Sequence, residues 1–125
     1  MVLDTTVFID LFRDKKPAKD FFLYTLFPLR TSRIVVMELI YGLKMKKDIK
    51  LLLKQLESLH IEITEIDEDL SKEAGRLFET YFHSHGLGVM DAFVAATALV
   101  RQEELATHNV KHYRFIKGLK LVTPY

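Results

Sequence analysis

Residues 1–12 read MVLDTTVFIDLF, and this stretch decides how the fold is predicted. The apolar run Met1–Leu3 ends in the carboxylate of Asp4, which is typical of a short buried strand. From Thr5 to Arg13, apolar side chains recur about one helical turn apart, so a helix is expected directly after that strand. A strand followed at once by a helix is the repeating unit of a parallel α/β sheet.

The rest of the chain extends this alternation. Thr31 and Ser32 supply a helix N-cap, Asp67 supplies another, and Pro28 ends a helix. The order β-α-α-α-α-β-α-α-β-α-β indicates an α/β fold with a parallel sheet and helices on both faces. Helices are predicted over residues 18–27, 34–46, 49–56, 70–84, 90–101 and 110–115, and further strands over 60–66, 104–107 and 119–122.

Composition limits the classes of protein to consider. The 125 residues include 18 Lys and Arg against 17 Asp and Glu, so the net charge of +1 gives no bulk signal for nucleic-acid binding. The absence of Cys excludes disulfides, thiolate zinc sites and cysteine nucleophiles. No signal peptide or membrane span is indicated, because Asp4 and Asp10 interrupt the apolar start and the run 86–100 is too short. We therefore expect one cytoplasmic domain, residues 1–125, that does not contact a membrane.

Three acidic residues stand where a parallel sheet places its chemistry. Ligands bind outside the carboxyl ends of the strands in such sheets, and Asp4 follows the first strand. Asp91 opens an apolar helix, and Glu38 interrupts the apolar run 34–41. Thr107 and Asn109 end a third strand. These residues are the candidates for a common site.

Each candidate also has a structural interpretation. Asp4 and Asp91 are favoured helix caps, and Thr107 and Asn109 are ordinary turn residues. A buried carboxylate such as Glu38 must be compensated, and a salt bridge to Lys or Arg would achieve this. If the acids instead converge, they raise one another's pKa until a cation neutralises them. Oxygen ligands of this kind suit Mg²⁺ or Mn²⁺, which can assist hydrolysis of a phosphodiester.

Four stretches of the chain resemble, in order, the motifs of PIN-domain ribonucleases, and most closely those of the VapC-type toxins of type II toxin–antitoxin pairs. The stretches are DTTVFID (residues 4–10), ELIYGL (38–43), GVMDAFVAATA (88–98) and LATHNVKHY (105–113). The resemblance implies a three-layer α/β/α sandwich around a parallel sheet. It also implies a metal-dependent endoribonuclease that cleaves RNA with Mg²⁺ or Mn²⁺.

The family's acidic positions carry over onto Asp4, Glu38 and Asp91, which the resemblance makes the catalytic and metal-binding residues. Thr6 and Thr107 match its hydroxyl positions. Its fourth acidic position falls on Asn109, which keeps an oxygen but removes a negative charge. A second metal would therefore be held more weakly. A site with one metal is favoured, or one whose second ion is held mainly by an RNA phosphate.

Basic and aromatic clusters provide candidate surfaces for partners. A locally basic region predicts an RNA-binding surface, and a solvated helix face is the alternative. The resemblance implies a cognate antitoxin, for which the apolar helices between residues 18 and 56 offer a docking surface. Core packing is the alternative for their aromatic side chains. The basic candidates are Arg13, Lys15, Lys44, Lys46 and Lys47, and the aromatic ones are Phe21, Phe22, Tyr24 and Phe27.

The expected assembly is a homodimer formed through helical surfaces. Two other functions are compatible with the same candidate residues. One is an RNA-processing or structure-specific nuclease without an antitoxin, and the other is a catalytically weak PIN-like binding module. Asn109 favours the binding module, whereas the three retained acids argue against it. The pairs His108/His112 and His83/His85 do not have the ligand pattern of a zinc site.

Overall fold

The computed structural model describes residues 1–26 and 28–125. Phe27, where a helix was predicted to end, lies outside the described residues. The elements follow one another in the order β1 (Val2–Leu3), α1 (Thr5–Phe12), α2 (Lys16–Tyr24), β2 (Arg30–Ser32), α3 (Arg33–Tyr41), α4 (Lys46–Ser58), β3 (Glu62–Thr64), α5 (Glu68–His85), α6 (Val89–Arg101), β4 (Leu105–Ala106), the 3₁₀ turn η1 (Val110–His112) and β5 (Leu121–Val122).

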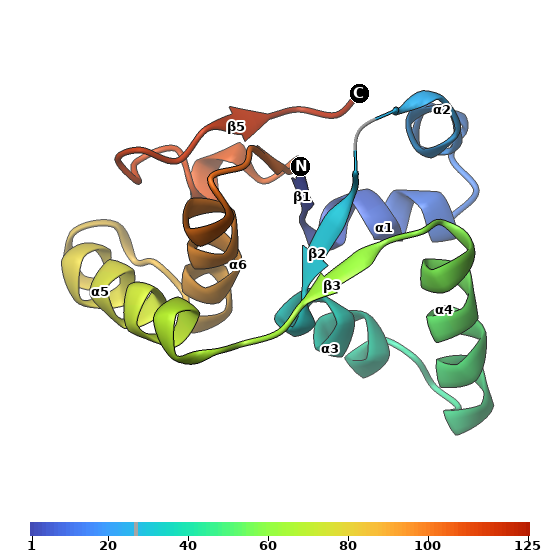
Figure 1. The fold of residues 1–125 in the computed structure, drawn as a ribbon, viewed down its shortest axis with the longest axis horizontal. Coiled ribbons are helices and arrows are strands. Elements are labelled where there is room, and N and C mark those ends of the chain that lie inside the picture. The colour runs from blue at the N-terminus through green and yellow to red at the C-terminus, as the bar shows by residue number, and fades with distance from the viewer. Residues whose placement is uncertain (27) are drawn as a thin grey trace.

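A parallel five-stranded sheet in the order β3-β2-β1-β4-β5 forms the middle layer. Figure 1 shows α5 and α6 to the left of the sheet and α1, α2 and α4 to its right. The predicted three-layer α/β/α sandwich is therefore confirmed. Because β1 is the central strand, its carboxyl end lies between those of β2 and β4.

The predicted succession of helices and strands along the chain lacked one strand. Residues 30–32 form β2, which pairs with both β1 and β3, whereas only a helix N-cap was expected there. Ser32 does cap α3, since its hydroxyl accepts the Ile34 amide, and the three-residue strand precedes that cap. α3 ends at Tyr41, earlier than predicted, and residues 110–112 form a 3₁₀ turn where a longer helix was expected.

The core lies where the strands meet the inner faces of the helices. β1 and β4 are completely buried, and α6 presents small residues that let it pack closely on the sheet and on α5. The small side chains of Ala92, Ala95 and Ala96 are almost fully enclosed. None of the helices in the described part of the chain combines the length and apolar character needed to cross a membrane.

Candidate active site

Asp4 lies at the carboxyl end of β1, where it is 5% exposed. Its Oδ1 accepts the Thr5 amide at 2.8 Å, so Asp4 caps α1, as the structural interpretation predicted. Its Oδ2 accepts the Thr107 hydroxyl at 2.7 Å from the end of the neighbouring strand β4. The carboxylate is thus fixed from two elements, and its capping role does not exclude a second one.

Glu38 projects from α3 and is half-buried. Its Oε2 accepts the Thr5 hydroxyl at 3.1 Å. The predicted alternative, a salt bridge from Lys or Arg, is wrong: within residues 1–26 and 28–125, neither residue type forms an ion pair with Glu38. Its charge is left without a protein cation.

Asp91 occupies the third position of α6, whose N-cap is Gly88. The alternative prediction that Asp91 caps this helix is therefore wrong. Its Oδ1 accepts the hydroxyl of Tyr113 at 3.1 Å, and its Oδ2 lies 3.1 Å from Nδ1 of His112. Side chains from the segment after β4 thus contact both carboxylate oxygens.

The three carboxylates share one electrostatic environment. Burial raises the pKa of Asp4, and the charge of Asp91 raises it further, although hydrogen bonds from Thr107 and Thr5 oppose the shift. Burial likewise raises the pKa of Glu38, and both aspartates add to that increase. Like charges held together in this way favour any cation that can enter between them.

The chemistry of the donor set fits a hard divalent cation. Carboxylate oxygens are the preferred ligands of Mg²⁺ and Mn²⁺, and no Lys or Arg in the described ranges pairs with Asp4, Glu38 or Asp91. Over the same ranges, however, no group of three or more His, Asp or Glu side chains forms a ready-made metal site. The fit therefore rests on charge and ligand type.

The predicted hydroxyl and amide residues make different contacts in the structure. Thr107 is fully buried and contacts Asp4 directly. Thr6 instead accepts the His108 amide at 3.2 Å and ties that segment to α1. The backbone amide of Asn109 donates to the Thr107 hydroxyl at 2.9 Å, and its side chain is exposed. Of these three candidates, Thr107 is the one that contacts an acid of the site.

The basic candidates are exposed and spread over two regions. Arg13 and Glu38 line the same hollow of about 300 Å³ between α1 and α3. Lys15 pairs with Asp10 at 2.8 Å. Lys44 lies between α3 and α4, and Lys46 and Lys47 lie in the first turn of α4. Arg13 is thus the basic candidate that shares a surface with an acid of the site.

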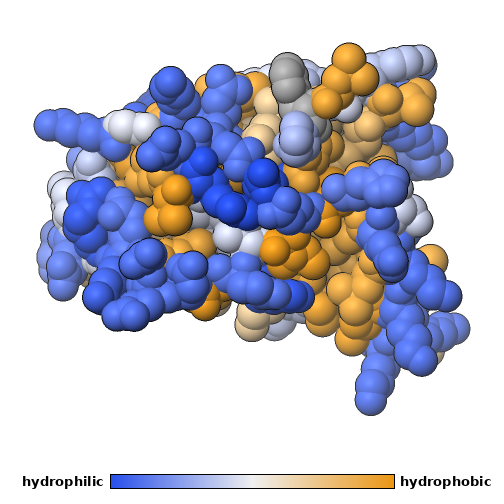
Figure 2. Space-filling model, in the orientation of Figure 1, coloured by the Kyte–Doolittle hydropathy of each residue, from blue (hydrophilic) through white to orange (hydrophobic). Residues whose placement is uncertain are grey.

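The aromatic candidates also divide. Phe21 and Phe22 are half-buried and pack on each other, and Phe22 also packs on Phe8, as the core interpretation predicted. Tyr24 is 72% exposed, and Phe27 lies outside the described residues. Figure 2 shows hydrophobic surface on the right half of this face, where Figure 1 places α1, α2 and α4. The exposed apolar side chains of α2, α4 and the segment after α2 are Leu23, Tyr24, Leu26, Leu51 and Leu53.

The sequence prediction missed Thr5, His112 and Tyr113. Thr5 follows the first acid directly, and its hydroxyl reaches Glu38 while Thr6 does not. Burial and the charges of Asp4 and Asp91 raise the pKa of Tyr113, so its hydroxyl stays protonated and can donate. Both His112 and Tyr113 belong to the motif at residues 105–113, but no sequence periodicity indicated which side chain would turn toward Asp91.

Comparisons with known proteins identify the family of the chain. The family model described as PIN domain matches residues 1–117. Ribonuclease VapC19 of Mycobacterium tuberculosis is 31% identical over 126 residues, covering 95% of this chain and 96% of that protein.

Two solved structures have the same fold. One is a toxin–antitoxin complex from Klebsiella pneumoniae, with 30% identity, a TM-score of 0.78 and coverage of 99% of this chain and 97% of that one. The other is VapBC-1 from nontypeable Haemophilus influenzae, with 24% identity, a TM-score of 0.79 and coverage of 98% and 96%. The site stands on the fold that these proteins share, and the chain belongs to the PIN-domain family, among its VapC-type members.

Proposed function

We propose that this protein is a Mg²⁺-dependent endoribonuclease and the toxin of a toxin–antitoxin pair. The observation that carries the proposal is the electrostatic coupling of Asp4, Glu38 and Asp91. Burial and the charge of Asp91 raise the pKa of Asp4, and burial and both aspartates raise the pKa of Glu38. The PIN-domain match and the similarity to a ribonuclease and to a toxin–antitoxin complex support it.

In the proposed reaction, Asp4 and Asp91 would hold a divalent cation directly. Glu38 would hold it through water or would orient the attacking water. A bound divalent cation activates water and stabilises the oxygen that leaves the phosphodiester. Thr107 keeps the Asp4 carboxylate in place, and Thr5 does the same for Glu38. Asn109 supplies no carboxylate, so we propose one strongly held metal.

The experiment is to incubate the protein with total RNA and Mg²⁺ and to map the cut sites. Asp4→Asn and Asp91→Asn should each lower the cleavage rate by about 100-fold or more, because each removes a charge that holds the cation. The matched control is Asp69→Asn, an exposed acid in the first turn of α5 that should cleave as the parent does. Cleavage by both site variants at the parent rate would refute the proposal.

The same variants separate the alternative functions. Cleavage of structured DNA but not of RNA would favour a structure-specific nuclease. A weak binding module has no need of a cation site, so calorimetric titration with Mn²⁺ should then give no heat of binding.

We propose that the antitoxin docks on the exposed apolar surface of α2 and α4. Tyr24 and Leu26 are 72% and 95% exposed, and Leu51 on α4 is 57% exposed. A hollow of about 380 Å³ lies between these helices and α1, lined in part by Phe12 and Leu59. Co-purification of a small partner protein would support toxin status, and its loss on Leu51→Asp would locate the surface.

The proposed assembly is a homodimer that forms through helical surfaces. Phe82 on α5 and Val89 on α6 are 45% and 53% exposed and offer apolar area for such a contact. Light scattering of the purified protein tests this directly, since a monomer at all concentrations would contradict it.

A further inference from the structure

Each of the three acids receives a hydrogen bond from a hydroxyl group that belongs to another residue of the site. The pairs are Thr107 with Asp4, Thr5 with Glu38 and Tyr113 with Asp91, at 2.7, 3.1 and 3.1 Å. A hydroxyl donor fixes the direction of a carboxylate without neutralising its charge. Of these three donors, Tyr113 is the one whose side chain belongs to the hydrophobic core.

Tyr113 is held more firmly than an ordinary surface donor. The residue is 1% exposed and belongs to the hydrophobic core, so its ring is fixed by packing. A buried phenol needs a partner for its hydroxyl, and the partner here is Oδ1 of Asp91. The position of this carboxylate oxygen is therefore coupled to the packing of the core.

The other contact of Asp91 is different in kind. His112 approaches Oδ2 through Nδ1 at 3.1 Å, but its side chain is 55% exposed. An exposed side chain has more freedom to leave than a buried one. Tyr113 is therefore the contact that fixes the orientation of Asp91.

We propose that Tyr113 is a positioning residue that orients the Asp91 carboxylate for binding a divalent cation. This inference rests on the proposed function and deepens it. Partners behind a metal-binding side chain set its orientation, and their loss commonly weakens metal affinity 10-fold to 100-fold. Tyr113→Phe removes only the hydroxyl and keeps the ring that fills the core.

The test is calorimetric titration of the full chain with Mn²⁺, comparing the parent, Tyr113→Phe and Tyr81→Phe. Tyr81 is the matched control, because its hydroxyl contacts the Lys117 amide, away from the three acids. Tyr113→Phe should bind Mn²⁺ about 10-fold more weakly, with the same number of sites per molecule. Tyr81→Phe should bind as the parent does.

A second measurement separates positioning from a merely structural role. The Mn²⁺ concentration for half-maximal RNA cleavage should rise by a similar factor in Tyr113→Phe, and saturating Mn²⁺ should restore most of the rate. A variant that is only partly folded would instead show fewer sites of unchanged affinity.

The possible outcomes distinguish this inference from the function it rests on. A parent that binds and cleaves while Tyr113→Phe binds Mn²⁺ equally well overturns the role of Tyr113 and leaves the function standing. A shift in His112→Gln but not in Tyr113→Phe also overturns it, since the orienting contact would then be His112. A parent that neither binds Mn²⁺ nor cleaves RNA overturns both.

Discussion

Glu38 is a half-buried carboxylate that folding places beside two other acids. Burial and the charges of Asp4 and Asp91 raise its pKa, so its ionised form is disfavoured in the folded chain relative to the unfolded one. A group of this kind lowers stability at pH values above its unfolded pKa. Such a loss of stability is expected where acids are held together to bind a cation.

Glu38→Gln should therefore raise the melting temperature of the metal-free protein at neutral pH while removing most of the cleavage activity. The glutamine oxygen still accepts the Thr5 hydroxyl, and the repulsion from Asp4 and Asp91 disappears. As the pH falls through the raised pKa of Glu38, the parent carboxyl is protonated and the difference should vanish. Thermal melts in chelator, from neutral to acidic pH, measure this.

Glu79→Gln is the control for that series. Glu79 is exposed on α5, and its substitution should leave the melting temperature and its pH dependence unchanged. A lower melting temperature for Glu38→Gln than for the parent at neutral pH would contradict the electrostatic account.

At the scale of single residues, the sequence located the acids of the site but not the side chains that hydrogen-bond to them. Asp4 was located because it follows an apolar run, and Glu38 because it interrupts one. The contacts from Thr5 and Tyr113 depend on side-chain directions that only the packed structure defines. Tyr113 was therefore indistinguishable from any core aromatic residue.

Helix α5 shows how local sequence sets the bounds of an element. Asp67 accepts the Leu70 amide at 2.9 Å at the start, and Gly86 ends the helix with φ at 69°. Both signals are legible in the sequence, so the predicted helix agrees with the structure to within two residues at its amino end and one at its carboxyl end. β2 carries no such signal, because the three residues Arg30–Ser32 show neither an apolar run nor alternation.

The glycine inside α5 and the glycine that ends this helix should respond to substitution by alanine in opposite directions. Gly75 lies inside the helix, and a Cβ there meets nothing within 4 Å, so Gly75→Ala should stabilise the protein by about 1 kcal/mol. Gly86 adopts the left-handed conformation, so Gly86→Ala should destabilise it by about 1 kcal/mol. Urea unfolding of both variants checks the signs. Destabilisation by Gly75→Ala would mean that this face of α5 is covered.

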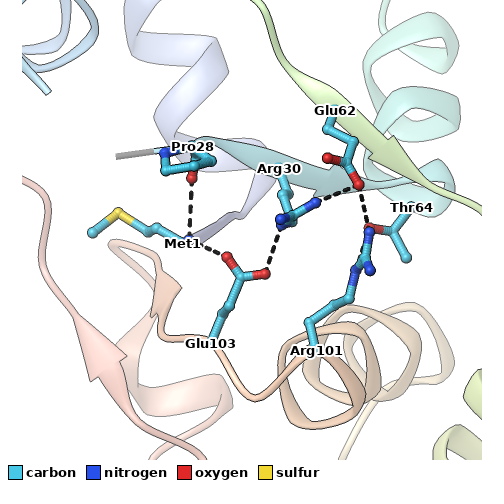
Figure 3. Close-up of polar contacts among 7 residues, drawn as sticks. All are labelled: Met1, Pro28, Arg30, Glu62, Thr64, Arg101 and Glu103. Atoms are coloured by element: carbon cyan, nitrogen blue, oxygen red, sulfur yellow. Dashed lines mark hydrogen bonds and ion pairs between the residues drawn. The ribbon is translucent and has the colours of Figure 1, made fainter. Parts of the chain in front are cut away.

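Over the whole molecule, the parallel sheet separates the site from a network of ion pairs. Asp4 and Thr107 meet at the carboxyl ends of β1 and β4, although they lie 103 residues apart in the sequence. At the opposite ends, Arg30 lies between Glu103 and Glu62, and Glu62 also pairs with Arg101. Figure 3 shows this network joining β2, β3 and the carboxyl end of α6. Sequence patterns predicted the parallel sheet but not this network. Its charged residues follow no regular spacing in the sequence, so no pattern indicated which of them would pair.

The network should stabilise the fold without affecting the chemistry, and Glu103→Gln tests this. Glu103 is 22% exposed, and its Oε2 lies 2.7 Å from Nε of Arg30, while Oε1 accepts the Met1 amino group. Burial alone would raise the pKa of Glu103, but the amino group and Arg30 lower it overall. The stabilisation is therefore present above the unfolded pKa and is lost as the pH falls through the lowered folded pKa.

We expect Glu103→Gln to reduce the free energy of unfolding by about 1 to 2 kcal/mol at neutral pH, because a partly buried charged pair is lost. At acidic pH the free energies of unfolding of the parent and of Glu103→Gln should become equal. RNA cleavage should be unchanged, since the site lies at the other ends of the strands. Glu68→Gln is the control: it breaks an exposed pair with Lys72 and should change stability by less than about 0.5 kcal/mol. Urea unfolding at two pH values gives both differences. Equal losses in the two variants would show that the network adds nothing beyond an ordinary surface pair.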